Sequence, residues 1–239
     1  MRAPVRSMER DAVLDDLAHR VVALRPGERV AVAVDGVDGA GKTMLADQLG
    51  DVIRSLSPSG RPVARVGVDG FHHARARRYA HGTGPDTFYA DSYDYDAFRR
   101  CVLTPFRAGR PLTPAAFDVE ADVMVTPTPV PTAEGTLLLV DGIFLQRPEL
   151  AGQWDAVVFV DAPFAVTVPR GNARFDGHHD PDPEAVTNRR YVEGQRLYLA
   201  QARPRERATW VFDNTDLDRP LLTSSLTPPG SAGGSPAAH

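Results

Sequence analysis

A glycine-rich segment of eight residues carries the clearest chemical signal in the sequence. Residues 36–43 read Gly-Val-Asp-Gly-Ala-Gly-Lys-Thr and fit the pattern G-x-x-x-x-G-K-[ST] at every specified position. The glycines let successive backbone N–H groups converge on phosphate oxygens at the positive end of a following helix. Lys42 would then reach the β and γ phosphates of ATP, and the Thr43 hydroxyl would be a ligand of Mg²⁺. The residues that we expect to bind ATP are Gly36, Asp38, Gly39, Ala40, Gly41, Lys42 and Thr43.

The context of this segment favours phosphate binding over a glycine-rich turn with a solvated lysine. Val30–Val34 is short, apolar and rich in β-branched residues, which is typical of a strand buried on both faces of a parallel sheet. Residues 44–56 follow the segment and place Leu45 and Leu49 on one face of a predicted helix. Lys42 is also the single lysine among 27 lysine and arginine residues.

An aspartate follows the next apolar strand. Pro62–Val68 leads directly into Asp69, and the carboxyl ends of parallel strands border the ligand crevice of such sheets. Asp69 would therefore lie beside the phosphate-binding loop, where it could accept the proton of a hydroxyl during phosphoryl transfer. The alternative interpretation is an aspartate that caps the next turn. Because GTPases, motors and regulatory ATPases share the loop, the side that receives the phosphoryl group must decide the class.

Strands and helices alternate along the chain and must position these residues. We predict an amphipathic helix over 9–24 and apolar strands at 30–34, 62–68, 137–140, 156–160 and 209–212. This alternation favours an α/β fold with a mainly parallel sheet that helices cover on both faces. Residues 105–131 contain six prolines and predict a loop or hairpin excursion from the sheet. Residues 223–239 lack apolar surface, and we expect a disordered tail there.

Composition excludes several classes of protein. Hydrophobic residues make up 42% and charged residues 24% of the 239 residues, which is typical of a soluble globular protein. The net charge of -4 gives no global positive field, so we expect neither nucleic acid nor a membrane as partner. Cys101 is the only cysteine, and no apolar run is long enough to span a membrane. We therefore expect a cytoplasmic protein.

Six ordered blocks resemble the uridine kinase and phosphoribulokinase-like P-loop kinases, a family with a pantothenate kinase branch. The resemblance covers about residues 28–216, and its blocks are 35–43, 68–72, 88–94, 139–144, 159–163 and 190–214. It implies the three-layer P-loop NTPase fold in a single domain, 1–222. It also implies a helical lid at about 163–186 and a substrate-binding role for the proline-rich excursion at about 105–133.

The resemblance assigns roles to residues on the acceptor side. Asp69 matches the general base of the family, and Asp91 matches an acid that contacts sugar hydroxyls. Phe117 lies where an aromatic residue stacks on the base of a nucleoside. Phe71 and His72 fall in the block around Asp69, and we expect both to bind the acceptor.

The resemblance also assigns the groups that handle negative charge. Asp141 matches the acidic residue that helps hold Mg²⁺ through water, together with Thr43. Arg170 and Arg174 match the lid arginines that clamp the transferring phosphoryl group, and Arg170 would also touch the substrate. With Lys42, these cations would neutralise charge as the transition state forms.

The chain departs from the family pattern in the lid and the acceptor region. Thr167 and Pro169 stand where relatives commonly have arginine or a helix-compatible residue, and we expect Pro169 to break or kink a helix. Asp122 stands about where pyrimidine-specific members offer a histidine. The residues His72, His73, Arg75, Arg77, Arg78 and His81 form a positive run. This run could contact phosphate or the acceptor, or it could be a solvated loop.

These features predict an ATP- and Mg²⁺-dependent kinase of the uridine kinase type that phosphorylates a nucleoside or similar small alcohol. The acceptor could instead be pantothenate, a sugar or a secondary-metabolite alcohol. A module that senses the nucleotide without an acceptor is the alternative from another class. Assembly into a homo-oligomer is left open by the sequence.

Overall fold

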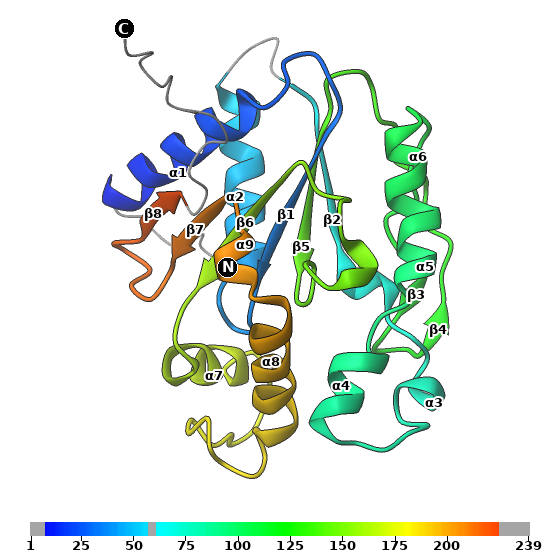
Figure 1. Cartoon of the computed structure of the whole chain (residues 1–239), viewed down its shortest axis with the longest axis vertical. Coiled ribbons are helices and arrows are strands. Elements are labelled where there is room, and N and C mark those ends of the chain that lie inside the picture. The colour runs from blue at the N-terminus through cyan, green and yellow to red at the C-terminus, as the bar shows by residue number, and fades with distance from the viewer. Residues whose placement is uncertain (1–7, 57–60, 225–239) are drawn as a thin grey trace, which may run out of the picture.

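One mainly parallel sheet organises the residues that the computed structural model describes, which are 8–56 and 61–224. The strand order is β2-β5-β1-β6-β7-β8, and only the β7–β8 pair is antiparallel (Figure 1). The strands are β1 (Val30–Gly36), β2 (Val63–Gly67), β5 (Leu137–Gly142), β6 (Ala156–Asp161), β7 (Trp210–Asp213) and β8 (Leu221–Ser224). The predicted α/β class with a mainly parallel sheet is confirmed.

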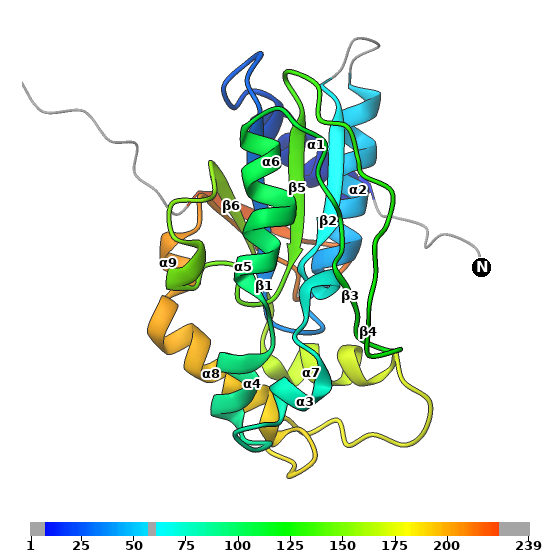
Figure 2. The same cartoon turned by 90° about the vertical axis from the view of Figure 1, so that its right-hand side faces the viewer.

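Helices cover both faces of this sheet and gather at the carboxyl ends of its strands. Figure 2 shows α5 and α6 on one side of the sheet and α1 on the other, while α3, α4, α7 and α8 lie at one end. The α-helices are α1 (Met8–Val22), α2 (Lys42–Ser55), α3 (Arg75–Arg78), α4 (Pro85–Asp91), α5 (Tyr95–Phe98), α6 (Thr104–Arg107), α7 (Phe164–Asn172), α8 (Arg189–Ala202) and α9 (Pro204–Arg207). The other helical segments are the 3₁₀ turns η1 (Val68–Phe71) and η3 (Pro148–Leu150) and the π-helical segment η2 (Arg99–Leu103).

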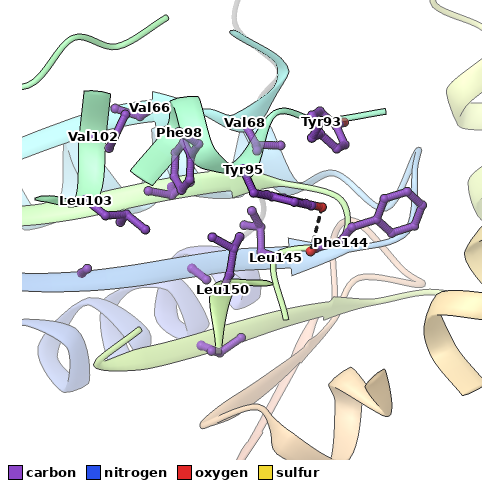
Figure 3. Close-up of a cluster of buried hydrophobic side chains, with 14 of the residues drawn as sticks. Val66, Val68, Tyr93, Tyr95, Phe98, Val102, Leu103, Phe144, Leu145 and Leu150 are labelled. Atoms are coloured by element: carbon purple, nitrogen blue, oxygen red, sulfur yellow. Dashed lines mark hydrogen bonds between the residues drawn. The ribbon is translucent and has the colours of Figure 1, made fainter. Parts of the chain in front are cut away.

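Alternate side chains of β1 enter two separate cores. Val30, Val32 and Val34 pack with side chains of α1 and α2 on one face. Ala31 and Ala33 belong to the opposite core, which holds most of the aromatic residues. Figure 3 shows part of this second core, where the Tyr95 hydroxyl donates a hydrogen bond to the carbonyl oxygen of Phe144. With apolar contacts on both faces, β1 holds the loop that follows it in a fixed position.

The proline-rich excursion forms a hairpin beside the end of β2, as the sequence predicted. Strands β3 (Phe117–Asp118) and β4 (Val123–Met124) pair antiparallel, and an isolated bridge joins Leu112 to Val130. The backbone N–H of Ala116 donates a hydrogen bond to Gly70 O at 2.8 Å. The hairpin is therefore attached to the turn that contains Asp69.

Two local features differ from the sequence expectations. Helix α7 runs through Pro169 unbroken, and Ala173 N donates to Pro169 O at 3.0 Å. The final strand, β8, was not predicted and includes Thr223 and Ser224, which the sequence assigned to the tail. The rest of that tail, 225–239, lies outside the described residues. Among the described helices, none combines the length and the apolar character needed to cross a membrane.

Candidate active site

The loop between β1 and α2 has the backbone that its glycines predict. Gly39 and Gly41 have φ angles of +73° and +95°, a region that favours glycine. A Cβ atom on Gly39 would lie 2.0 Å from the carbonyl oxygen of Thr167, because helix α7 packs directly against the loop. The loop ends at the first turn of α2, so its backbone N–H groups lie near the N-terminal end of this helix. The helix dipole favours an anion at that end.

The ammonium group of Lys42 is buried, with four carboxylates within electrostatic range. Its Nζ atom donates a hydrogen bond to Val37 O at 2.7 Å, and the residue is 8% exposed. Burial lowers the pKa of Lys42, and nearby carboxylates oppose this effect, in the order Asp38, Asp69, Asp35 and Asp141. Asp69 from the end of β2 is thus within electrostatic range of the phosphate-binding lysine.

Thr43 and Asp141 meet at the position expected for a metal ion. Strand β5 lies next to β1 with Val34 opposite Asp141, so its carboxyl end reaches the phosphate-binding loop. Thr43 Oγ1 donates a hydrogen bond to Asp141 Oδ2 at 2.6 Å, and Arg65 Nη2 donates to Asp141 Oδ1 at 3.1 Å. A hydroxyl and a carboxylate oxygen are suitable ligands for Mg²⁺, which takes its remaining ligands from phosphates and water. The residues at this position fit the predicted ion.

Tyr93 holds the Asp69 carboxylate at the end of β2. The Tyr93 hydroxyl donates a hydrogen bond to Asp69 Oδ1 at 2.7 Å, while Asp69 itself is exposed. Burial, followed by the neighbouring Asp69, raises the pKa of Tyr93 well above its ordinary value. The phenol therefore stays protonated and acts as a donor, which orients one carboxylate oxygen and leaves the other accessible. This arrangement suits a base that receives the proton of a hydroxyl.

The remaining residues predicted to bind the acceptor differ in their contacts and in how exposed they are. They are His72, Asp91, Phe117 and Phe71. The His72 ring stacks near Tyr93 at a centroid distance of 4.3 Å, and its Nδ1 lies 2.8 Å from Asp69 O. Asp91 pairs with His81 at 3.1 Å. Phe117 is 6% exposed, and Phe71 is 1% exposed with its ring edge-to-face on Phe98. Phe71 is thus a core residue that supports the turn around Asp69.

Both predicted lid arginines border the nucleotide side of the loop. A cavity of about 360 Å³ is lined by residues 38–44 with Arg170, Arg174 and Leu217. Arg170 donates 2.8 Å hydrogen bonds to the carbonyl oxygens of Asn214 and Thr215. Arg174 Nη2 donates to Asp38 Oδ1 at 2.6 Å, which links the lid to the loop. The lid thus supplies two cations at the edge of the predicted ATP site.

Several residues that no sequence motif singles out support the loop. Asn214 Nδ2 donates a hydrogen bond to Ala40 O at 2.7 Å, and Gln195 Oε1 accepts one from Asp38 N. Asp35 is fully buried and accepts hydrogen bonds from the Tyr198 hydroxyl and from Gln146 Nε2. Burial raises the pKa of Asp35, and these donors oppose the rise.

Only weak sequence signals could have identified these supports. Asn214 and Gln195 fall inside the last of the matching blocks, but their partners Ala40 and Asp38 lie 174 and 157 positions away. Tyr93 falls in the block 88–94, where only Asp91 received a role. Pairings of this kind become visible when the fold is known.

Solved structures show which known proteins the fold resembles. The described fold is similar to a "possible uridine kinase" from Bacillus stearothermophilus, with a TM-score of 0.70, 26% sequence identity, and coverage of 86% of this chain and 100% of that one. The chain has a P-loop kinase-like fold. It is also similar to a "putative fructose transport system kinase" from Silicibacter sp. TM1040, with a TM-score of 0.59, 22% identity, and coverage of 84% and 96% of the two chains.

These likenesses confirm the resemblance inferred from the sequence blocks at the level of a P-loop kinase-like protein. No protein-family model matches the sequence, and no curated protein matches it. Kinase-like neighbours indicate a phosphotransferase, and the acceptor is a separate question.

Proposed function

We propose that the protein is an ATP-dependent phosphotransferase of the uridine kinase type. It would move the γ-phosphoryl group of ATP to a hydroxyl of a nucleoside or a similar small alcohol. The observation that carries this proposal is the position of Asp69. Its carboxylate is exposed, is oriented by Tyr93 and lies within electrostatic range of Lys42.

The residues around the loop have the chemistry that this reaction needs. The backbone N–H groups of the loop and Lys42 would bind the phosphates, and Arg170 and Arg174 would neutralise charge at the lid side. Asp69 would accept the proton as the acceptor oxygen attacks the γ-phosphorus. Mg²⁺, held by Thr43 and Asp141, would supply further positive charge at the phosphate oxygens. The loop would thus bind the phosphoryl donor, and Asp69 would act on the acceptor.

The acceptor side distinguishes this function from nucleotide sensing. A sensing module would need the loop and a mobile segment, but it would have no use for an exposed carboxylate oriented by a buried tyrosine. Pantothenate, a sugar or a secondary-metabolite alcohol would require the same machinery as a nucleoside. Acceptor identity is therefore the part of the proposal to test first.

An acceptor panel assayed by ADP release tests the proposal. The protein is mixed with ATP and Mg²⁺ and then with uridine, cytidine, adenosine, pantothenate or fructose, and mass spectrometry detects the phosphorylated product. We expect at least one acceptor to raise ADP release above the background rate. Lys42→Ala should abolish this increase, while Arg54→Ala, at an exposed site on the same helix, should leave it unchanged. ATP binding without any stimulated release would favour the sensing module.

A further inference from the structure

Two arginines from distant parts of the chain meet at one tyrosine ring. The Cζ atom of Arg190, the second residue of α8, lies 4.8 Å from the ring centroid of Tyr79 and 5.8 Å from that of Phe88. The Cζ atom of Arg78, the last residue of α3, lies 5.5 Å from the same Tyr79 centroid. Two positive charges thus lie about one aromatic side chain, in a protein whose net charge is -4.

Neither guanidinium group has an anionic partner in the described part of the chain. Arg190 Nε and Nη1 are buried and make no hydrogen bond with any described residue. Arg78 donates one hydrogen bond, from Nε to His73 O at 2.9 Å, and forms no ion pair with the described residues. A buried N–H of a charged group without an acceptor is costly, so such a group calls for a function. An oxyanion would satisfy both side chains, because guanidinium groups bind carboxylate and phosphate in a fork.

Arg78 of this pair is connected to the turn that carries Asp69. Arg78 Nε donates a hydrogen bond to His73 O at 2.9 Å, and the preceding residue, His72, forms a bridge with Tyr93. The Tyr93 hydroxyl donates to Asp69 Oδ1, and His72 Nδ1 lies 2.8 Å from Asp69 O. The charge of Arg78 also lowers the pKa of His72, after burial and against the effect of Asp69. An anion bound at the arginine pair would lie on the acceptor side of Asp69.

Four carboxylates of the surrounding elements have other partners. Asp91 at the end of α4 pairs with His81 at 3.1 Å. Asp94 accepts a hydrogen bond from Ala97 N at the start of α5, and Asp122 accepts one from Arg75 N. On the facing helix α8, Glu193 pairs with Arg196 at 2.6 Å. The two arginines therefore keep their positive charge available for a ligand.

We propose that the acceptor carries an anionic group, a carboxylate or a phosphate, which binds at Arg190 and Arg78 while its hydroxyl faces Asp69. This inference rests on the proposed kinase function and narrows its acceptor class. Binding at Arg78 would give the positively charged run at residues 72–81 a role in recognising the acceptor. A hydroxy acid or a sugar phosphate would then be preferred to an uncharged alcohol.

Matched acceptor pairs test the preference directly. In each pair the second member lacks the negative charge: glycerate with glyceramide, pantothenate with its amide, and ribose 5-phosphate with ribose, which lacks the phosphate group. The first two pairs test carboxylate and the third tests phosphate. We expect kcat/KM for the charged member of at least one pair to exceed that of the neutral member by about tenfold or more, as is typical of charge-assisted hydrogen bonds. Higher kcat/KM for the neutral members in every pair would overturn the proposal.

Variants connect the preference to the arginines. Arg190→Gln should lower kcat/KM for the charged acceptor by about tenfold and change it less than about twofold for the neutral one. Arg190→Lys should restore part of the preference, because it keeps the charge. Arg100→Gln, at an exposed arginine on η2, is the matched control and should behave as the wild type. An equal loss for both members of a pair in Arg190→Gln would mean a structural role and would contradict the proposal.

A binding measurement separates this inference from the kinase function. Calorimetry at low ionic strength measures inorganic phosphate binding to Lys42→Ala, in which the phosphate-binding loop is disabled. We expect the binding to be lost when Arg78→Gln and Arg190→Gln are added. Phosphate binding that these changes leave intact, or no binding in the Lys42→Ala protein, would overturn the anion site. If no acceptor is phosphorylated, the kinase function fails, and calorimetry still decides the anion site.

Discussion

Removing one oxygen atom from Tyr93 is predicted to slow phosphoryl transfer with little effect on folding. Tyr93→Phe deletes the donor that lies 2.7 Å from Asp69 Oδ1. A hydrogen bond to a charged group contributes about 1.5–3 kcal/mol, and water can replace part of it because Asp69 is exposed. We therefore expect the activation free energy of phosphoryl transfer to rise by about 1.5 kcal/mol, near the lower end of this range. This rise corresponds to about a tenfold fall in kcat.

The aromatic ring of Tyr93 keeps its packing in this variant. Its centroid lies 4.3 Å from that of His72 and 6.0 Å from that of Tyr95, contacts that phenylalanine preserves. The free energy of unfolding, measured by urea denaturation, should therefore change by no more than about 1 kcal/mol.

Tyr95→Phe is the matched control for this experiment. It removes another buried hydroxyl, which donates to Phe144 O rather than to Asp69, and it should leave kcat unchanged. The assay is initial-rate ADP release at saturating ATP with the acceptor identified by the panel. Wild-type kcat in Tyr93→Phe, or equal losses in the two variants, would refute the orienting role of Tyr93.

Three further predictions concern the loop, the metal position and pH. Gly39→Ala should weaken ATP binding, measured with a fluorescent ATP analogue, by more than about tenfold, since its Cβ would meet Thr167 O at 2.0 Å. Gly152→Ala shares the φ of +73° without a clash and should bind normally. Asp141→Asn should raise the Mg²⁺ concentration for half-maximal activity about tenfold, and an unchanged Mg²⁺ dependence would contradict the assigned site. Burial lowers the pKa of His72 below its ordinary 6.5, so the unfolded chain takes up the proton first and the free energy of unfolding should fall as pH drops below 6.5. Urea denaturation should show a smaller fall in His72→Gln, and an identical slope would exclude His72 as the cause.

The sequence predicted the sheet and the loop because local patterns specify them. Val30–Val34 is apolar on both faces, and the strand β1 found there extends only two residues further. The loop at 36–43 depends on glycine conformations and a helix start, both of which are local properties. Strand β8 was missed because Leu221–Ser224 is a mainly exposed edge strand with no apolar pattern, and pairing with β7 defines it.

The supports of the site could not be predicted in the same way, because they depend on contacts between distant residues. Tyr93 reaches Asp69 because residues 72 and 93 form a bridge, which no periodicity in the sequence reveals. Phe71 illustrates the opposite case. Its place beside Asp69 suggested contact with the acceptor, but the turn η1 directs its ring into the core against Phe98. Successive side chains of a 3₁₀ turn point about 120° apart, so the backbone conformation decides which of them faces the ligand.

Turnover by Asp69→Asn shows whether the Asp69 carboxylate is the base that receives the acceptor proton. The amide keeps the size of the side chain but cannot accept the acceptor proton as a base. We expect kcat to fall by about 10²- to 10⁴-fold while the dissociation constant for ATP stays within about twofold of the wild type. An Asp69→Asn protein that binds ATP normally and phosphorylates the acceptor at the wild-type rate would contradict the role of Asp69 as the base.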